Sequence, residues 1–136
     1  MPVNLEIQRR EKEGVVILDL KGRLIVGEAA TRLRETINKE ASQSCTNIIL
    51  NLEEVDYIDS TGLGGMVICY TTLQKSKGTL KLLKLNRRNI ELLLLTKLST
   101  VFELFADEQD AINSFFPERE IKRFDILSFV QQQKNE

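Results

Sequence analysis

The sequence reads Val55-Asp56-Tyr57-Ile58-Asp59-Ser60-Thr61-Gly62-Leu63-Gly64-Gly65-Met66-Val67 in the stretch that decides its fold. An apolar segment leads through an Asp-Ser-Thr turn into apolar residues with helical spacing. The core face of the predicted helix contains Leu63, Met66, Val67, Tyr70 and Leu73. The helix is expected to reach about Lys77, before Gly78. Ser60 is therefore expected at the N-terminus of a helix that follows a buried strand.

The segments on either side of this stretch alternate between strand and helix patterns. Apolar or alternating runs predict strands at Leu5–Gln8, Val15–Leu20, Arg23–Val26, Thr46–Leu52, Leu80–Leu85 and Val101–Leu104. Helical spacing and capping predict helices at Glu28–Ser42, at Ile90–Leu98 and from the Asp107 cap to Phe115. Gly22 is expected to form a turn in an N-terminal hairpin. The alternation predicts an α/β fold with a small mixed, mainly parallel sheet flanked by helices.

The chain of 136 residues is long enough for one domain with its own core. Pro117 marks its expected end, so residues 1–116 are predicted to form the domain and residues 117–136 a C-terminal extension. The extension carries Ile121, Phe124, Leu127 and Phe129 in a charged background, which is compatible with an added helix. Two uses of the extension remain open, docking on the domain itself or contact with a second copy or another partner.

Composition excludes several classes of function. The 19 Lys and Arg residues and 20 Asp and Glu residues form no long block of one sign, so nucleic acid is not an expected partner. No apolar run approaches the ~20 residues that insertion across a bilayer requires. Cys45 and Cys69 lie beside apolar segments and are expected as reduced, mostly buried thiols in a cytoplasmic protein. Histidine is absent, which removes the commonest general base and the commonest zinc ligand, and no complete catalytic motif is present. We therefore expect neither an enzyme nor a bound metal or cofactor.

Ser60 and its neighbours form the candidate site. A helix N-terminus offers free backbone N–H groups and a positive dipole end, which favour a phosphate on Ser60 or, as runner-up, on Thr61. Asp59 adds an acceptor beside the serine, and Gly62 helps to leave the helix start bare for an approaching protein. The alternative is purely structural, because an Asp or Ser before a helix is commonly an N-cap and glycine permits close packing.

The outward side of the predicted helix supplies the candidate partner contacts. Helical geometry places Thr61, Gly64, Gly65, Ile68 and Thr72 away from the core. Ile68 is then an apolar residue beside a bare glycine surface. It is either an ordinary exposed isoleucine or part of a docking patch. The docking hypothesis assigns partner binding to Gly64, Gly65, Ile68 and Thr72.

The segment Val55–Gly64 resembles the signature of the STAS domain family, the anti-sigma factor antagonists, and the likeness in element order runs from about Leu5 to Phe116. The resemblance implies a small sheet flanked by helices. It also implies that a serine kinase of the histidine-kinase-like ATPase type, itself an anti-sigma factor, phosphorylates Ser60. The unphosphorylated form would bind this kinase and release a sigma factor, and a separate serine phosphatase would reset the switch. Whether the chain forms a homodimer is left open.

Other functions fit the sequence less well. A dinucleotide-binding enzyme would need a third glycine where Val67 stands, and a phospho-aspartate receiver would need an acidic pair where Asp19 stands alone. The acidic residues Glu53, Glu54, Asp56 and Asp59 are expected as a solvated loop rather than a metal site. The stronger alternative is a non-switching STAS module, either a scaffold in a signalling assembly or an accessory subunit of a membrane transporter.

Overall fold

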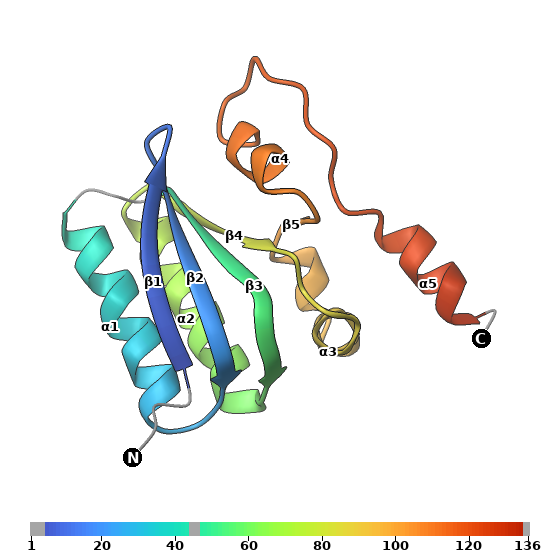
Figure 1. Cartoon of the computed structure of the whole chain (residues 1–136), viewed down its shortest axis with the longest axis horizontal. Coiled ribbons are helices and arrows are strands. Elements are labelled where there is room, and N and C mark those ends of the chain that lie inside the picture. The colour runs from blue at the N-terminus through green and yellow to red at the C-terminus, as the bar shows by residue number, and fades with distance from the viewer. Residues whose placement is uncertain (1–4, 44–46, 135–136) are drawn as a thin grey trace.

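A five-stranded sheet forms the centre of the protein in this computed structural model, which describes residues 5–43 and 47–134 (Figure 1). Its strands are β1 (Leu5–Lys12), β2 (Val15–Leu24), β3 (Asn47–Ile58), β4 (Thr79–Leu83) and β5 (Leu104–Phe105). They lie in the order β1-β2-β3-β4-β5, with β1 antiparallel to β2 and all other neighbours parallel. The predicted mixed, mainly parallel sheet is confirmed.

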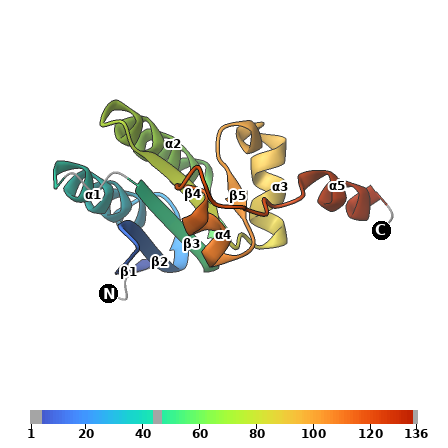
Figure 2. The same ribbon diagram turned by 90° about the horizontal axis from the view of Figure 1, so that it is seen from above.

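Helices cover both faces of this sheet. They are α1 (Glu28–Ser42), α2 (Ser60–Lys75), α3 (Arg87–Leu95), the short 3-10 helix η1 (Leu98–Thr100), α4 (Glu108–Asn113) and α5 (Ile126–Lys134). Figure 2 shows α1 and α2 side by side on one face and α4 on the other. Within the part of the chain that the structure describes, no helix has the length and apolar character needed to span a membrane.

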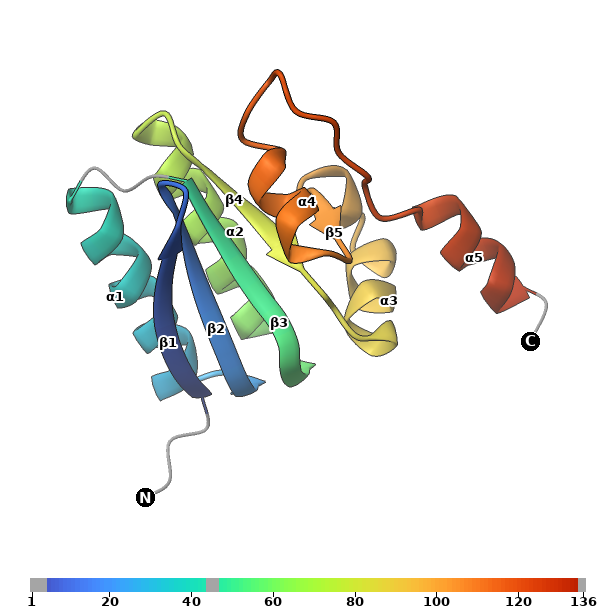
Figure 3. The same ribbon diagram turned by 45° about the horizontal axis from the view of Figure 1, so that its top comes forward.

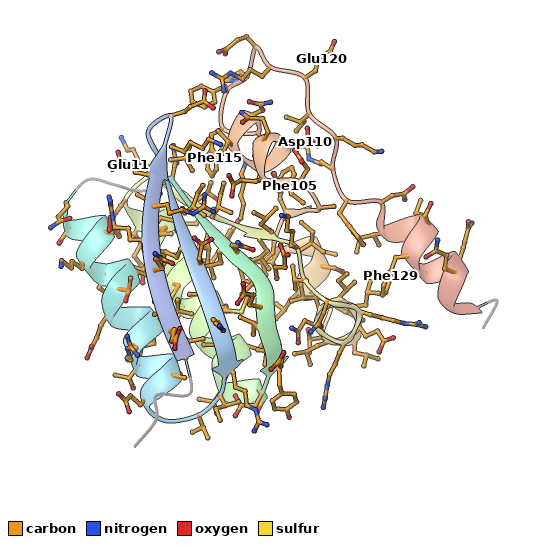
Figure 4. The ribbon with its side chains drawn as sticks, in the orientation of Figure 1. Glu11, Phe105, Asp110, Phe115, Glu120 and Phe129 are labelled. Carbon is orange, nitrogen blue, oxygen red and sulfur yellow. The ribbon has the colours of Figure 1, made fainter. Side chains whose placement is uncertain are left out.

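Two apolar layers follow from the alternation of side chains along the inner strands. In β2, Val16 and Leu18 face the layer under α1 and α2, whereas Val15 and Ile17 face the layer under α4. Phe105 and Phe115 line the α4 side, as Figure 4 shows. The unbroken apolar runs of β2 and β3 are therefore explained by burial on both faces.

The extension contacts the edge of the sheet before it forms α5. The N–H group of Phe124 donates to the carbonyl oxygen of Leu104 at 3.1 Å. Phe124 also lies 6.0 Å from Phe129, measured between ring centroids, so an aromatic contact joins α5 to the segment of the extension that precedes it. The helix itself lies beyond α3, away from the sheet (Figure 1).

The predicted turn at Gly22 is wrong. Gly22 lies inside β2, opposite Leu5 of β1 and Val55 of β3. Its φ of 118° and a shift in register beside it mark a bulge, which a glycine inside a strand also indicates. The hairpin turn lies instead at Glu13 and Gly14, both with positive φ. The predicted strand Arg23–Val26 is thus the end of β2, which stops at Leu24.

Other boundaries shift for local reasons. Strand β3 continues to Ile58 rather than ending at Leu52, because Val55 and Ile58 remain buried between exposed acidic residues. Helix α3 begins at Arg87 because Asn86 caps it by accepting from the N–H group of Asn89 at 2.8 Å. The Asp107 cap is confirmed, since its carboxylate accepts from the N–H group of Asp110 at 3.0 Å. The ends of β4, β5, α2, α3 and α4 also differ from the predicted Leu85, Leu104, Lys77, Leu98 and Phe115. The predicted start of a strand at Thr46 falls outside the described residues.

Candidate functional site

Hydrogen bonds of Asp59 stabilise the turn from β3 into α2. One carboxylate oxygen, Oδ1, accepts from the N–H group of Gly62 at 2.7 Å, and the other, Oδ2, accepts from that of Val26 at 2.9 Å. The N–H group of Asp59 donates to the carbonyl oxygen of Leu24 at 3.2 Å. Asp59 therefore caps α2 and ties its first turn to the end of β2.

These contacts keep the Asp59 side chain charged. Desolvation is the largest single influence on this carboxyl group and opposes its ionisation, but the N–H groups of Gly62, Val26 and Thr61 together lower its pKa. The carboxylate is thus a fixed negative charge beside Ser60. A phosphate on Ser60 would be repelled by this charge and attracted by the N-terminus of α2.

Gly62 is required for packing. A Cβ atom at this position would lie 2.1 Å from the carbonyl oxygen of Leu24. Gly62 is buried, so it is not part of the bare surface proposed for a partner. Gly64 differs, because it is exposed and a Cβ atom there would meet nothing within 4 Å. The close-packing explanation holds for Gly62 and has no support at Gly64.

The outer face of α2, defined by Thr61, Gly64 and Ile68, is exposed, and Ile68 is 51% exposed. Thr72 is half-buried. The helical wheel also predicts an exposed Gly65, and this is wrong because Gly65 is buried.

Gly65 is buried because α2 packs on α1 as well as on the sheet. The buried sector of α2 is rotated toward Cys69, which lies four residues after Gly65 on the same side of the helix. Arg34 of α1 acts electrostatically on Cys69, which places this side of α2 toward α1. Val67 and Tyr70, predicted in the core, are accordingly only half-buried.

Cys69 is buried, as predicted, and it is a free thiol. Its burial raises its pKa to about 11, against a smaller opposing effect of Arg34. The thiol is therefore protonated at neutral pH, and the thiolate is the reactive form. Cys45 lies outside the described residues.

Ser60 is exposed and borders a pocket of about 290 Å³ between α3 and the turn from β3 into α2. The pocket is lined by Tyr57, Ile58, Asp59, Ser60, Arg88, Asn89, Glu91, Leu92 and Leu95. The guanidinium group of Arg88 lies over the Tyr57 ring, 4.4 Å from its centroid. Figure 3 shows the end of β3 and the first turn of α3 at the same edge of the sheet.

Of the residues that line this pocket, the sequence predictions named only Asp59 and Ser60 as site residues, and they missed Tyr57 and Arg88 among others. They also missed Val26, which binds Asp59. A signal for Arg88 was available, because the carboxyl ends of parallel strands meet at one edge and the residues after them become neighbours. Val26 is 64% exposed, and its N–H group donates to Asp59. Nothing local in the sequence marks Val26 as a neighbour of Asp59.

A second pocket lies elsewhere on the molecule. A pocket of about 350 Å³ is lined by Glu53, Lys84, Leu85, Ile90, Leu104, Phe105, Ala106 and Phe124, and it does not include Ser60. Glu53 forms an ion pair with Lys84 at 3.1 Å. Among the described residues, no group of three or more His, Cys, Asp or Glu side chains is arranged to hold a metal ion.

Comparison with known proteins identifies the family of the chain. Residues 6–111 match the family model of the STAS domain. The anti-sigma-B factor antagonist of Bacillus subtilis (strain 168) is 29% identical over 110 residues, which are 81% of this chain and 99% of that protein.

Two solved structures have the same fold. An anti-sigma factor antagonist from Mycobacterium paratuberculosis superposes with a TM-score of 0.70 at 21% identity, over 81% of this chain and 92% of that one. The Bacillus cell fate determinant SpoIIAA, in its phosphorylated form, gives 0.64 at 24% identity, over 81% and 99%. The family model covers most of the chain, and the chain therefore belongs to the STAS domain family.

Proposed function

We propose that this protein is a phosphorylation-switched regulator of the anti-sigma factor antagonist type. In its unphosphorylated form it binds an anti-sigma factor that is also a serine kinase, which frees a sigma factor. Phosphorylation of Ser60 ends the binding, and a serine phosphatase restores it. The observation that carries the proposal is the exposure of Ser60 at the start of α2, directly beside the outer face of that helix.

The surface around Ser60 suits a protein partner. Val26 and Ile68 expose apolar side chains, and Gly64 lets a partner approach the helix backbone. Burying such apolar surface contributes about 25 cal/mol for each Å² removed from water. Thr61 adds a small polar group to the outer face of α2. Support also comes from the Bacillus subtilis relative, whose name describes an anti-sigma-B factor antagonist.

A phosphate at Ser60 would oppose this binding without unfolding the domain. It adds a charge of about −1.5 to −2 at neutral pH, and the N-terminus of α2 offsets part of its repulsion by Asp59. A docked partner would have to dehydrate the same charge, at a cost of several kcal/mol. A loss of only ~3 kcal/mol lowers affinity more than a hundredfold.

Isothermal titration calorimetry tests the proposal. The titrant is the histidine-kinase-like ATPase encoded nearest to this gene, used with unmodified protein, Ser60-phosphorylated protein, Ser60→Ala, Ser60→Asp and Thr61→Ala. We expect tight binding by the unmodified protein and Ser60→Ala, and weak binding by the phosphorylated form and Ser60→Asp. Thr61→Ala is the matched control and should retain phosphorylation control. Equal affinity of the phosphorylated and unmodified forms would contradict the proposal.

The proposed role requires binding and no turnover by this chain. Its sequence has no histidine to act as a general base. A pull-down with unmodified protein distinguishes this role from that of a transporter subunit. Recovery of a permease in place of the kinase would favour the transporter role.

A further inference from the structure

Arg88 stands out among the basic residues near Ser60. It lies in the first turn of α3, is exposed, and stacks on Tyr57 with 4.4 Å between its guanidinium carbon and the ring centroid. Its neighbour Arg87 is paired with Glu91 at 3.4 Å. Among the side chains that the structure describes, no carboxylate lies within ion-pair distance of Arg88. Arg88 is thus positioned by an aromatic contact and remains available to an anion.

We propose that Arg88 binds the phosphate group of phosphorylated Ser60 in the pocket between α3 and the turn from β3 into α2. This inference rests on the proposed function, because it concerns the phosphorylated form. The carrying observation is that Ser60 and Arg88 line the same pocket, from two different helices.

The charges around the pocket favour this contact. Asp59 and Glu91 also line it, so without a cation a phosphate would face two carboxylates. Both carboxylates already have partners, because Asp59 accepts from Gly62 and Val26, and Glu91 pairs with Arg87. A guanidinium group can bind phosphate through two parallel N–H···O bonds. The ammonium group of lysine cannot form this paired arrangement, so arginine fits a phosphate better than lysine does.

The stacking on Tyr57 prepares Arg88 for this role. A long side chain normally loses rotamer freedom when it forms an ion pair, and this loss cancels much of the gain at a surface. The contact with Tyr57 already restricts the guanidinium group, so less freedom remains to be lost. Phosphorylation is therefore expected to link the first turns of α2 and α3 and to raise the melting temperature of the domain.

The experiment compares Arg88→Gln with the parent protein, each carrying phosphoserine incorporated at position 60 by an expanded genetic code. Phosphorus NMR gives the second pKa of the phosphate, which is ordinarily about 6. Pairing with Arg88 should lower this pKa by about 0.5–1 unit relative to Arg88→Gln. Arg88→Lys should give an intermediate value. Arg123→Gln removes one positive charge from the extension and serves as the matched control, with no effect expected.

Thermal melting supplies the second measurement. Phosphorylation should raise the melting temperature of the parent protein and not that of Arg88→Gln, each measured against its own unmodified form. Identical phosphate titration curves and identical melting shifts in the parent and Arg88→Gln proteins would overturn the inference.

Calorimetry with the kinase separates this result from the proposed function. If phosphorylated Arg88→Gln still fails to bind the kinase while its titration matches the parent, only the role of Arg88 is lost. If the phosphorylated parent binds as tightly as the unmodified protein while Arg88 still lowers the phosphate pKa, the switch is lost and the contact stands.

Discussion

Replacing Gly62 by alanine is the sharpest test of how α2 is attached to the sheet. The new Cβ atom would lie 2.1 Å from the carbonyl oxygen of Leu24, whereas ordinary contacts begin at 3.4 Å. The helix and strand would have to separate by about 1 Å or more. This movement would stretch the 3.2 Å bond from Asp59 to Leu24 and the 2.9 Å bond from Val26 to Asp59.

The expected magnitude follows from these contacts. Overpacking typically costs 1–3 kcal/mol and a lost hydrogen bond about 1 kcal/mol, while alanine returns up to ~1 kcal/mol of helix propensity. We expect Gly62→Ala to lower the free energy of unfolding by about 2–4 kcal/mol. Urea unfolding followed by circular dichroism at 222 nm should show a midpoint lowered by about 1–2 M.

Gly64→Ala is the matched control, because it makes the same chemical change two residues later where nothing lies within 4 Å. It should stabilise the protein by about 0.5–1 kcal/mol through helix propensity. The two substitutions should therefore differ in sign. Equal midpoints for Gly62→Ala and Gly64→Ala would refute the close approach of α2 to Leu24.

Three further predictions concern side chains near the site. Ile68→Glu should weaken kinase binding in calorimetry but change the free energy of unfolding by less than ~0.5 kcal/mol, because Ile68 is exposed; a large fall in melting temperature would place it in the core. In a Cys45→Ser variant, folded Cys69 should resist iodoacetamide at pH 8 and react after unfolding, because burial raises its pKa to about 11; rapid labelling of the native protein would contradict this. Asp59→Ala should lower the free energy of unfolding by about 1 kcal/mol at pH 7, and this gap between variant and parent should narrow in acid. The pKa of Asp59 is lowered by folding, so its contribution to stability is present above pH ~4 and is lost as the pH falls through the folded pKa. Urea midpoints at several pH values test this, and a gap that is constant down to pH 2.5 would count against it.

Local patterns predicted the elements whose formation depends on local contacts. The bounds of α1 and the start of α2 follow from helical spacing and from the Asp59 cap, which are properties of adjacent residues. Gly22 shows the limit, since a glycine can mark either a turn or a bulge and only pairing with β1 and β3 decides between them.

The residues of the candidate site also fall into those that local sequence predicts and those that depend on distant parts of the chain. Ser60 and Ile68 are identified by position along one helix, whereas the burial of Gly65 depends on α1, which packs from another part of the chain. Arg88 depends on still longer-range structure, because β4 must lie beside β3 before α3 can border the start of α2. A helical wheel contains no information about such neighbours.

The contact between Phe124 and Leu104 has a consequence for aggregation. Strand β5 is the outermost strand on its side of the sheet, and its outward carbonyl group is an acceptor that a strand of another molecule could use. The N–H group of Phe124 occupies this acceptor, at 3.1 Å. The bond comes from a residue beyond the matched segment 6–111. A residue outside the matched segment thus occupies one hydrogen-bond acceptor of this sheet edge, which leaves one acceptor fewer for pairing with a strand of another molecule.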